Sequence, residues 1–281
     1  MKILLTNDDG IRATGLWAAV EALRKVGEVF VVAPDREQSG VGASLTLHSS
    51  LRVTPEQVPD SVTGPTNGDP TGNENGVFPV TAYSVQGTPG DSCILALENV
   101  VGAVDLVVSG INSGSNLGWD VMVSGTFGAA LQGYVRGYPT IAISVGAVNN
   151  PQFSAASQLL EMMALRFRDN AQDFNSSLFL NINIPSLPVE RISGLKVTQL
   201  GSRSYGESVR VEGTGDDKRY WIARNRPISG TPVDGTDIWA MKNNYISITP
   251  MQISFSQQQQ AADVEKLVDG ISDELLKPSA D

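Results

Sequence analysis

Residues 1–35 read MKILLTNDDGIRATGLWAAVEALRKVGEVFVVAPD, and their pattern indicates the class of fold. Lys2–Thr6 is a short apolar run of strand length, and a second, β-branched run over Glu28–Ala33 ends at Pro34. Between them, Gly15–Val26 places apolar residues at helical spacing. Strand, helix and strand in this order form a β-α-β unit, which implies that the two strands are parallel.

The alternation of strand and helix continues to about residue 190. Further strands are predicted at Thr81–Gln86, Asp105–Ser109, Thr140–Val145 and Leu178–Ile184, with helices at about Gly90–Asn99, Gly125–Arg136 and Ser154–Phe167. Near-continuous apolar strands are typical of a sheet that helices cover on both faces. We therefore expect an α/β fold with a mostly parallel sheet.

Two stretches depart from this alternation. Pro59–Pro79 is rich in glycine, proline, asparagine and aspartate, which predicts a long exposed insertion. After about Gly194 we expect short strands around Lys196–Leu200, Ser208–Val211, Arg219–Ala223 and Tyr245–Thr249, then an amphipathic helix at about Ser256–Leu276. The turn EGTGDDK at 212–218 predicts a protruding β-hairpin.

The composition excludes several kinds of site. The 281 residues include one histidine, His48, and one cysteine, Cys93. These counts exclude an internal disulfide, cysteine zinc sites and two-histidine metal motifs, so a bound metal needs oxygen ligands. No P-loop, no G-x-G-x-x-G that opens a helix and no G-x-S-x-G elbow is present. We expect His48 to be a surface or structural residue and Cys93 to be a core residue.

The charge and the apolar runs indicate which partners to expect. A formal net charge of -10 argues against duplex nucleic acid, which favours a basic face. The N-terminus lacks the pattern of a signal peptide, and no apolar run approaches the roughly 18 residues of a membrane span. We expect a cytoplasmic protein without a membrane partner.

Two adjacent acids, Asp8 and Asp9, follow the first strand directly. Ligands of open parallel sheets bind beyond the carboxyl ends of strands, so a site is expected here. Two converging carboxylates repel each other unless a cation lies between them, and a hard divalent ion such as Mg²⁺ accepts carboxylate ligands. The alternative is structural: Asp8 starts a turn and Asp9 caps the following helix.

Polar loops follow two further strands. Pro34–Gly40 offers the hydroxyl of Ser39, and the glycine-rich loop 109–118 offers the amides of Asn112 and Asn116. An asparagine carbonyl can bind a hard cation, and its NH₂ group can donate to phosphate. A plain polar loop is the alternative for Pro34–Gly40.

Ser124, Gly125 and Thr126 open a predicted helix. Small residues and hydroxyls at a helix N-terminus suit phosphate, because the free N–H groups and the helix dipole favour anions. A capped, closely packed helix is the alternative. Turn formation alone could explain any one of these polar loops. It explains less easily why polar loops follow several successive strands.

The chain resembles the SurE family of survival proteins. The matching pieces are LLTNDDG (4–10), APDREQSG (33–40), GTPGD (87–91), SGINSGSNLG (109–118), SGTFGAA (124–130) and TDIWAMKNNYISITPM (236–251). The resemblance implies a Rossmann-like three-layer α/β core, with a hairpin and a C-terminal arm exchanged between subunits to give homodimers or homotetramers. It divides a single domain, residues 1–281, into a core (about 1–190), a hairpin and oligomerisation region (about 191–251) and a C-terminal helix (about 256–276).

The resemblance also implies the activity and the site. Family members are metal-dependent 5′/3′-nucleotidases and acid phosphatases that act on nucleoside monophosphates. One divalent cation per subunit, Mg²⁺ or Mn²⁺, is expected on Asp8, Asp9, Ser39 and Asn112. Phosphate is expected on Asn116, Ser124, Gly125 and Thr126, and the catalytic residues are expected to be Asp8, Asp9 and Asn116.

The chain also departs from the family pattern. Met122, Val123 and Phe127 replace the usual residues around Ser124, and Ser92 stands where the family usually has cysteine. We expect Met122 and Phe127 to reshape the substrate pocket.

The hypothesis is hydrolysis of a phosphomonoester by a metal-activated water, with Asp8 or Asp9 orienting or deprotonating that water. Two rivals remain: a non-catalytic nucleotide- or phosphate-binding module, and a phosphatase that forms an aspartyl-phosphate.

Overall fold

The computed structural model describes residues 1–63, 77–170, 178–202, 206–226 and 232–252, together with 265, 266 and 269. The chain divides into two compact units, Met1–Met251 and Gln252–Asp281, and all elements named below belong to the first. The predicted C-terminal helix lies almost wholly outside the described residues, as does the greater part of the predicted insertion.

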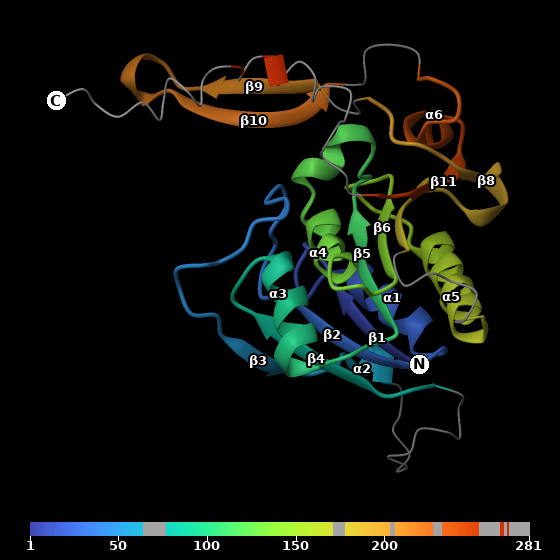
Figure 1. Ribbon diagram of the computed structural model, residues 1–281. Helices are drawn as coiled ribbons and strands as arrows, with labels where there is room; N and C mark the ends of the chain where they lie inside the picture. The colour runs from blue at the N-terminus through green and yellow to red at the C-terminus, as the bar shows by residue number, and fades with distance from the viewer. Residues whose placement is uncertain are drawn as a thin grey trace. The chain divides into compact units, whose positions relative to one another are not determined.

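A nine-stranded sheet forms the centre of the first unit, in the order β3-β4-β2-β1-β5-β6-β7-β11-β8 (Figure 1). The strands are β1 (Lys2–Thr6), β2 (Glu28–Pro34), β3 (Val53–Glu56), β4 (Val80–Val85), β5 (Leu106–Ser113), β6 (Thr140–Val145), β7 (Phe179–Ile184), β8 (Gly194–Val197) and β11 (Tyr245–Pro250). The six strands from β4 to β7 in this order are parallel, whereas β3 is antiparallel to β4 and β11 to β7. The predicted α/β fold with a mostly parallel sheet is confirmed.

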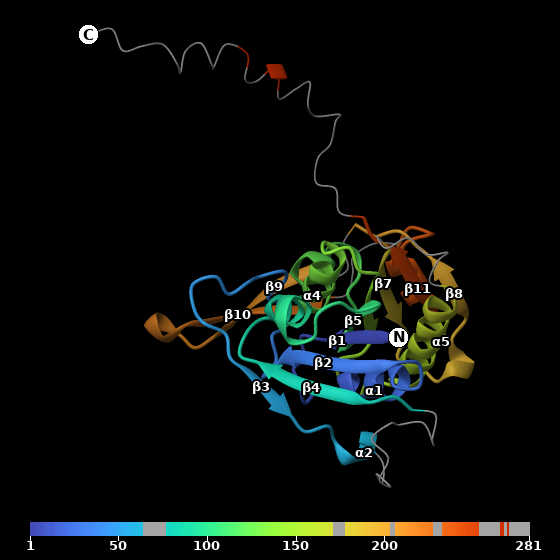
Figure 2. The same cartoon turned by 60° about the horizontal axis from the view of Figure 1, so that its bottom comes forward.

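Helices cover both faces of this sheet (Figures 1 and 2). α1 (Thr14–Leu23) and α5 (Ser154–Asp169) pack together on one face, and α3 (Pro89–Leu95) and α4 (Gly125–Tyr134) on the other. The alternation of side chains along β1 serves both layers. Ile3 and Leu5 join the core beside α1, whereas Leu4 joins the core that contains Cys93 of α3. The three layers expected from the family resemblance are therefore present.

Several elements were not predicted from the sequence. β3 contains Pro55 and lies at the edge of the sheet, where it pairs only with β4. An edge strand tolerates a proline that an inner strand does not. α6 (Asp237–Lys242) is short, and Thr236 caps it by accepting a hydrogen bond from the Trp239 N–H. Beyond these, α2 (Asp60–Thr63) lies in the predicted insertion, and a π-helical turn, Ala96–Val100, follows α3.

A separate two-stranded sheet confirms the predicted hairpin. β9 (Gly206–Glu212) and β10 (Arg219–Arg226) are antiparallel, and Figure 1 shows them apart from the nine-stranded sheet. In their register Val211 is opposite Tyr220 and Val209 is opposite Ile222. These four side chains therefore share one apolar face of the hairpin, and all four are exposed.

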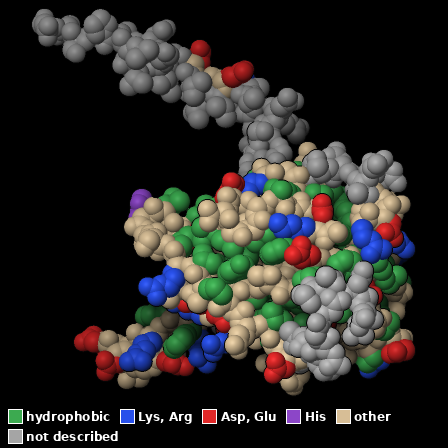
Figure 3. All heavy atoms as spheres, turned by 90° about the horizontal axis from the view of Figure 1, so that it is seen from below, with side chains coloured by type: hydrophobic (Ala, Val, Ile, Leu, Met, Phe, Trp, Pro, Cys, Tyr) green, Lys and Arg blue, Asp and Glu red, His purple; other side chains and the backbone are tan. Residues whose placement is uncertain are grey.

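The surface shows no strong segregation of charge on the face in Figure 3, where lysine and arginine side chains are interspersed with aspartate and glutamate. None of the helices in the described ranges combines the length and the apolar character that a bilayer crossing demands.

Candidate metal and phosphate site

The predicted site residues lie at the carboxyl edge of the central strands. β1 is flanked by β2 and β5, so the loops that follow these three strands meet at one edge of the sheet. The backbone N–H of Gln38 donates to the carbonyl oxygen of Asp8 at 2.7 Å, which joins the loop after β2 to the loop after β1. The N-terminus of α4 lies against the same loop, because Thr126 contacts Asp8.

Asp8 is buried against the first turn of α4. Its Oδ1 accepts a hydrogen bond from the Thr126 hydroxyl at 2.5 Å. A Cβ atom at Gly125 would lie 2.7 Å from the Cβ of Asp8, so only glycine allows this approach. The Thr126 hydroxyl therefore donates its proton to the Asp8 carboxylate and not to phosphate. The structure places the positive end of α4 on a proposed metal ligand.

The pKa of Asp8 is raised to about 6. Burial is the largest cause and the neighbouring charge of Asp9 adds to it, whereas the hydrogen bonds from Thr126 act in the opposite direction. This carboxylate is held in a place where its negative charge is only partly compensated.

Asp9 lies beside β5. Its Oδ2 accepts a hydrogen bond from the Ser113 N–H at 3.1 Å. Burial raises the pKa of Asp9 and the charge of Glu37 raises it further, although the bond from Ser113 lowers it. Asp9 does not cap α1, because the N-cap of that helix is Ala13. The structure thus removes one of the two structural alternatives.

Asn7, rather than Asp8, makes the turn after β1. Its side chain forms two hydrogen bonds with Gly10: the Gly10 N–H donates to Oδ1 at 3.2 Å, and Nδ2 donates to the Gly10 carbonyl at 3.0 Å. Because Asn7 closes the turn, both carboxylates are left for other contacts.

The two remaining proposed metal ligands differ in their surroundings. The exposed Ser39 donates its hydroxyl proton to Oε1 of Glu37 at 2.9 Å. Asn112 is buried near the end of β5, and its Nδ2 donates to the Gly114 carbonyl at 2.6 Å. Because the side-chain nitrogen of Asn112 is bound to Gly114, the oxygen of the same side-chain amide points away from Gly114.

Ser124 has the capping role that the sequence left as an alternative. Its hydroxyl oxygen accepts a hydrogen bond from the Phe127 N–H at 3.1 Å at the start of α4. Phe127 is buried and its ring packs on Phe179, with 4.8 Å between the ring centroids, so it belongs to the core. Met122, by contrast, is exposed two residues before Ser124.

Asn116 is held by residues that the sequence analysis did not select. Side chains of β6 and β7 form four hydrogen bonds with it, contributed by Ser144, Asn181 and Asn183. A signal was present in the sequence, because two amides alternate with apolar residues in FLNINI at 179–184. Polar residues with a period of two in a strand expected to be buried on both faces indicate a specific partner.

Two further acids tie the loops of the site in place. The buried Asp237 accepts hydrogen bonds from the N–H groups of Gly118, Gly201 and Ile238 at 2.7–2.8 Å, and burial raises its pKa. Asp91 closes a capping box with Thr88 at the start of α3 and also accepts a bond from the Thr46 N–H. Both acids belong to motifs of the family resemblance, and both organise backbone rather than face a ligand.

A divalent cation suits this donor set. The charged groups that shift the pKa values of Asp8 and Asp9 are both acidic: Asp9 raises the pKa of Asp8, and Glu37 raises the pKa of Asp9. Within the described residues, no cluster of three or more histidine, cysteine, aspartate or glutamate side chains could hold a metal. A cation here would therefore depend on two carboxylates together with neutral oxygens, which are the ligands of hard divalent ions.

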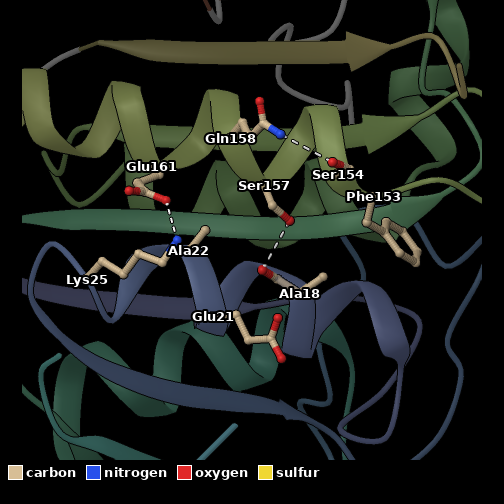
Figure 4. Close-up of a pocket in the computed structure, with 9 residues that line it drawn as sticks. All are labelled: Ala18, Glu21, Ala22, Lys25, Phe153, Ser154, Ser157, Gln158 and Glu161. Atoms are coloured by element: carbon tan, nitrogen blue, oxygen red, sulfur yellow. Dashed lines mark hydrogen bonds and ion pairs between the residues drawn. The ribbon is translucent and has the colours of Figure 1, made fainter. Parts of the chain in front are cut away.

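Other cavities and reactive side chains lie elsewhere. A polar groove of about 280 Å³ runs between α1 and α5 (Figure 4). Its side chains are largely bound within the groove, as in the pair of Lys25 Nζ and Glu161 Oε2 at 2.8 Å. His48 is exposed, and Cys93 is fully buried with its pKa raised to about 12 by burial, as expected of a surface residue and a core residue.

Comparison with known proteins identifies the family. The profile described as "Survival protein SurE" matches residues 3–207. A protein of Dehalococcoides mccartyi (strain CBDB1) named 5′-nucleotidase SurE is 44% identical over 92% of this chain and 91% of its own length. A protein of the same name from Geobacter sulfurreducens is 39% identical over 91% of this chain and 89% of its own length.

The fold agrees with these matches. The crystal structure of the SurE protein from Aquifex aeolicus superimposes with a TM-score of 0.75 at 33% identity, covering 96% of this chain and 100% of that one. The matches extend over all the motifs that the sequence analysis singled out in the first 207 residues. This chain belongs to the SurE family.

Proposed function

We propose that this protein is a 5′-nucleotidase that hydrolyses nucleoside 5′-monophosphates, and 3′-monophosphates as well, with one divalent cation, Mg²⁺ or Mn²⁺, per subunit. The observation that carries the proposal is the pair Asp8 and Asp9, two adjacent carboxylates after β1 that lie against Thr126 and Ser113 and whose pKa values are raised by burial and by a neighbouring acidic charge. The names of the curated relatives support the reaction class.

Asp8, Asp9, Ser39 and Asn112 are the residues that would hold the cation. When bound, the cation supplies Lewis-acid chemistry: it polarises a phosphoryl oxygen and lowers the pKa of a coordinated water. Thr126 fixes the Asp8 carboxylate on the helix, and the Ser113 N–H fixes one oxygen of Asp9. To hold the cation, Ser39 would give up the hydrogen bond that its hydroxyl donates to Glu37.

The remaining residues act on substrate and water. Asp9 is half-buried rather than enclosed, and it takes the proton of the attacking water. Oxygen of that water bonds to phosphorus, the ester P–O bond breaks, and the nucleoside oxygen leaves with the proton that Asp9 had accepted. Asn116 and the first turn of α4, formed by Ser124, Gly125 and Thr126, bind the non-bridging oxygens. The Ser124 N–H donates to the Val121 carbonyl and the Thr126 N–H donates to Asp8, so Gly125 supplies the backbone donor of this turn.

The test of this function is hydrolysis of AMP by purified protein. EDTA should abolish phosphate release, and Mn²⁺ or Mg²⁺ should restore it. Asp9→Asn should lower kcat by about 10²-fold or more with an unchanged circular dichroism spectrum, because it removes the proton acceptor. Asp105→Asn is the matched control, since Asp105 is exposed just before β5 and its carboxylate accepts a hydrogen bond from the Lys2 N–H there.

The outcomes separate the rival functions. A non-catalytic binding module would bind AMP but release no phosphate with any cation. An aspartyl-phosphate phosphatase would transfer ¹⁸O from labelled water into an acidic residue during a single turnover. Full activity of Asp9→Asn would refute the assignment of the site.

We also propose that the chain forms homodimers or homotetramers through the region 191–251. The support is the apolar face of the hairpin, where Val209 and Ile222 are 64% and 83% exposed. A monomeric protein seldom leaves such a strand face in water, and a second copy would cover it.

A further inference from the structure

β7 contains two buried amides that the proposed reaction does not use. Asn181 and Asn183 are both fully inaccessible to solvent, and they point to the same face of the sheet because they are two residues apart. A buried amide is unfavourable unless a specific partner satisfies it. The question is therefore what these two side chains hold.

Both amides hold the backbone of Asn116. The Asn116 N–H donates to Oδ1 of Asn183 at 2.8 Å, and Nδ2 of Asn183 donates back to the Asn116 carbonyl at 3.0 Å. Nδ2 of Asn181 donates to the same carbonyl at 2.9 Å. Asn183 thus binds both the backbone N–H and the backbone C=O of one loop residue, as a residue of a neighbouring strand would.

The side chain of Asn116 is oriented by the next strand. Its Nδ2 donates to the hydroxyl oxygen of Ser144 on β6 at 2.9 Å. Ser144 lies between Asn112 of β5 and Asn183 of β7 in the register of the parallel strands. We call the hydrogen bonds of Asn181 and Asn183 to the Asn116 backbone the clamp. One cross-strand row therefore connects a proposed metal ligand, Asn112, with this clamp.

Within the described residues, the clamp leaves one buried polar atom without a hydrogen bond, which destabilises the fold. Oδ1 of Asn181 is buried and has no hydrogen-bond partner among the described residues. An unsatisfied buried acceptor destabilises a fold, and an apolar side chain of similar size would not. What the Asn181 amide contributes in return is its NH₂ group, which donates to the Asn116 carbonyl.

We propose that Asn183 is a positioning residue for the reaction, because it fixes Asn116 so that the amide of Asn116 faces the phosphoryl group. This rests on the proposed function. Residues 114–117 lie between β5 and a 3-10 helix, Gly118–Val123, and belong to neither, so their geometry depends on such external contacts. Loss of the clamp should lower kcat, because a displacement of about 1 Å in a reacting constellation is able to reduce turnover by about 10²-fold.

The experiment compares Asn183→Leu with two matched variants. Asn181→Leu removes one of the three bonds to the Asn116 backbone, whereas Asn183→Leu removes two. Thr249→Val is the control: Thr249 is a buried hydroxyl on β11 that bonds to Thr198, and it is opposite Asn181 in the register but takes no part in the four hydrogen bonds of Asn116 described above. It tests the general effect of losing a buried polar contact at that end of the sheet.

The measurements are kcat and KM for AMP, the activation constant for Mn²⁺, and hydrogen exchange of a peptide containing Asn116. For Asn183→Leu we expect kcat to fall about 10²-fold, the Mn²⁺ constant to stay within about threefold, and the Asn116 amide to exchange faster. Asn181→Leu should have a smaller effect, and Thr249→Val should match the wild type. Asn183→Ser replaces Asn183→Leu if the latter does not fold.

Two outcomes would overturn the inference: unchanged kcat in the Asn183 variants, or an equal loss in Thr249→Val. Failure of the proposed function looks different. The wild type would then release no phosphate with any divalent cation, while the hydrogen exchange of the Asn116 amide would still report whether Asn183 holds the loop.

Discussion

Asp8 is held between opposing influences. Burial and the charge of Asp9 destabilise its ionised form, and the hydroxyl and N–H of Thr126 stabilise it. The balance leaves the pKa at about 6, against an ordinary value of 3.8. A fold that places a carboxylate in this way is more stable when a proton or a cation occupies the site.

The metal-free protein should therefore lose stability as the pH rises from about 4 to about 6. Over this window Asp8 ionises readily in the unfolded chain but reluctantly in the folded one. At about 1.4 kcal/mol per pKa unit, the raised pKa of Asp8 corresponds to about 3 kcal/mol of unfolding free energy. Thermal melting at constant ionic strength should show it, and Mn²⁺ should raise the melting temperature more at pH 7.5 than at pH 4.5.

Asp8→Asn is the variant that isolates this effect. It should remove the greater part of the pH dependence between pH 4 and 6 and weaken the response to Mn²⁺. If the variant and the wild type show the same pH dependence, Asp8 is not the group responsible.

At the scale of elements, the cap of α3 supports the loop that carries Ser39. The Thr88 hydroxyl donates to the Ser44 carbonyl at 2.8 Å, and Asp91 accepts from the Thr46 N–H at 2.9 Å. Although burial raises the pKa of Asp91, the hydrogen bonds from Thr46 and Thr88 outweigh it and hold the pKa below its usual value. The stabilisation from Asp91 is therefore present above about pH 4 and is lost as the pH falls further.

Thr88→Val should loosen this loop as well as the helix. We expect a loss of about 1 kcal/mol in unfolding free energy, faster proteolysis between residues 40 and 50, and a raised KM for AMP. Thr236→Val is the matched control, because Thr236 caps α6 in the same way but has no contact with residues 40–50. Equal proteolysis of the two variants at residues 40–50 would contradict the link between this cap and the loop.

The elements that could be predicted from the sequence are those with a strong period. The parallel strands were predicted because they are buried on both faces and are therefore apolar throughout. β3 was not predicted, because Pro55 and half-exposed neighbours hide its alternation at the sheet edge. α6 was not predicted, because six residues offer too few turns for a helical period.

At the scale of the whole molecule, the apolar face of the hairpin is the strongest indication of assembly. Ile222→Glu places a charge on that face and should shift the protein to a smaller mass in size-exclusion chromatography with light scattering. Arg210→Gln is the control, because Arg210 is opposite Trp221 on the other face of the hairpin. An unchanged mass for Ile222→Glu would place the interface elsewhere.

The alternation of strand and helix, the polar loops at the strand ends and an all-oxygen set of donors could be read from the amino-acid sequence. These follow from local periodicity and from the counts of histidine and cysteine. Which donor meets which acceptor depends on the folded chain. A threonine or an asparagine can equally well cap a helix, hold a loop or bind a ligand. Which of these roles it has depends on partners that are far away in the sequence. Thr126 is 118 residues from Asp8, and Asn183 is 67 residues from Asn116, so only the packing of the strands and of α4 brings these groups together.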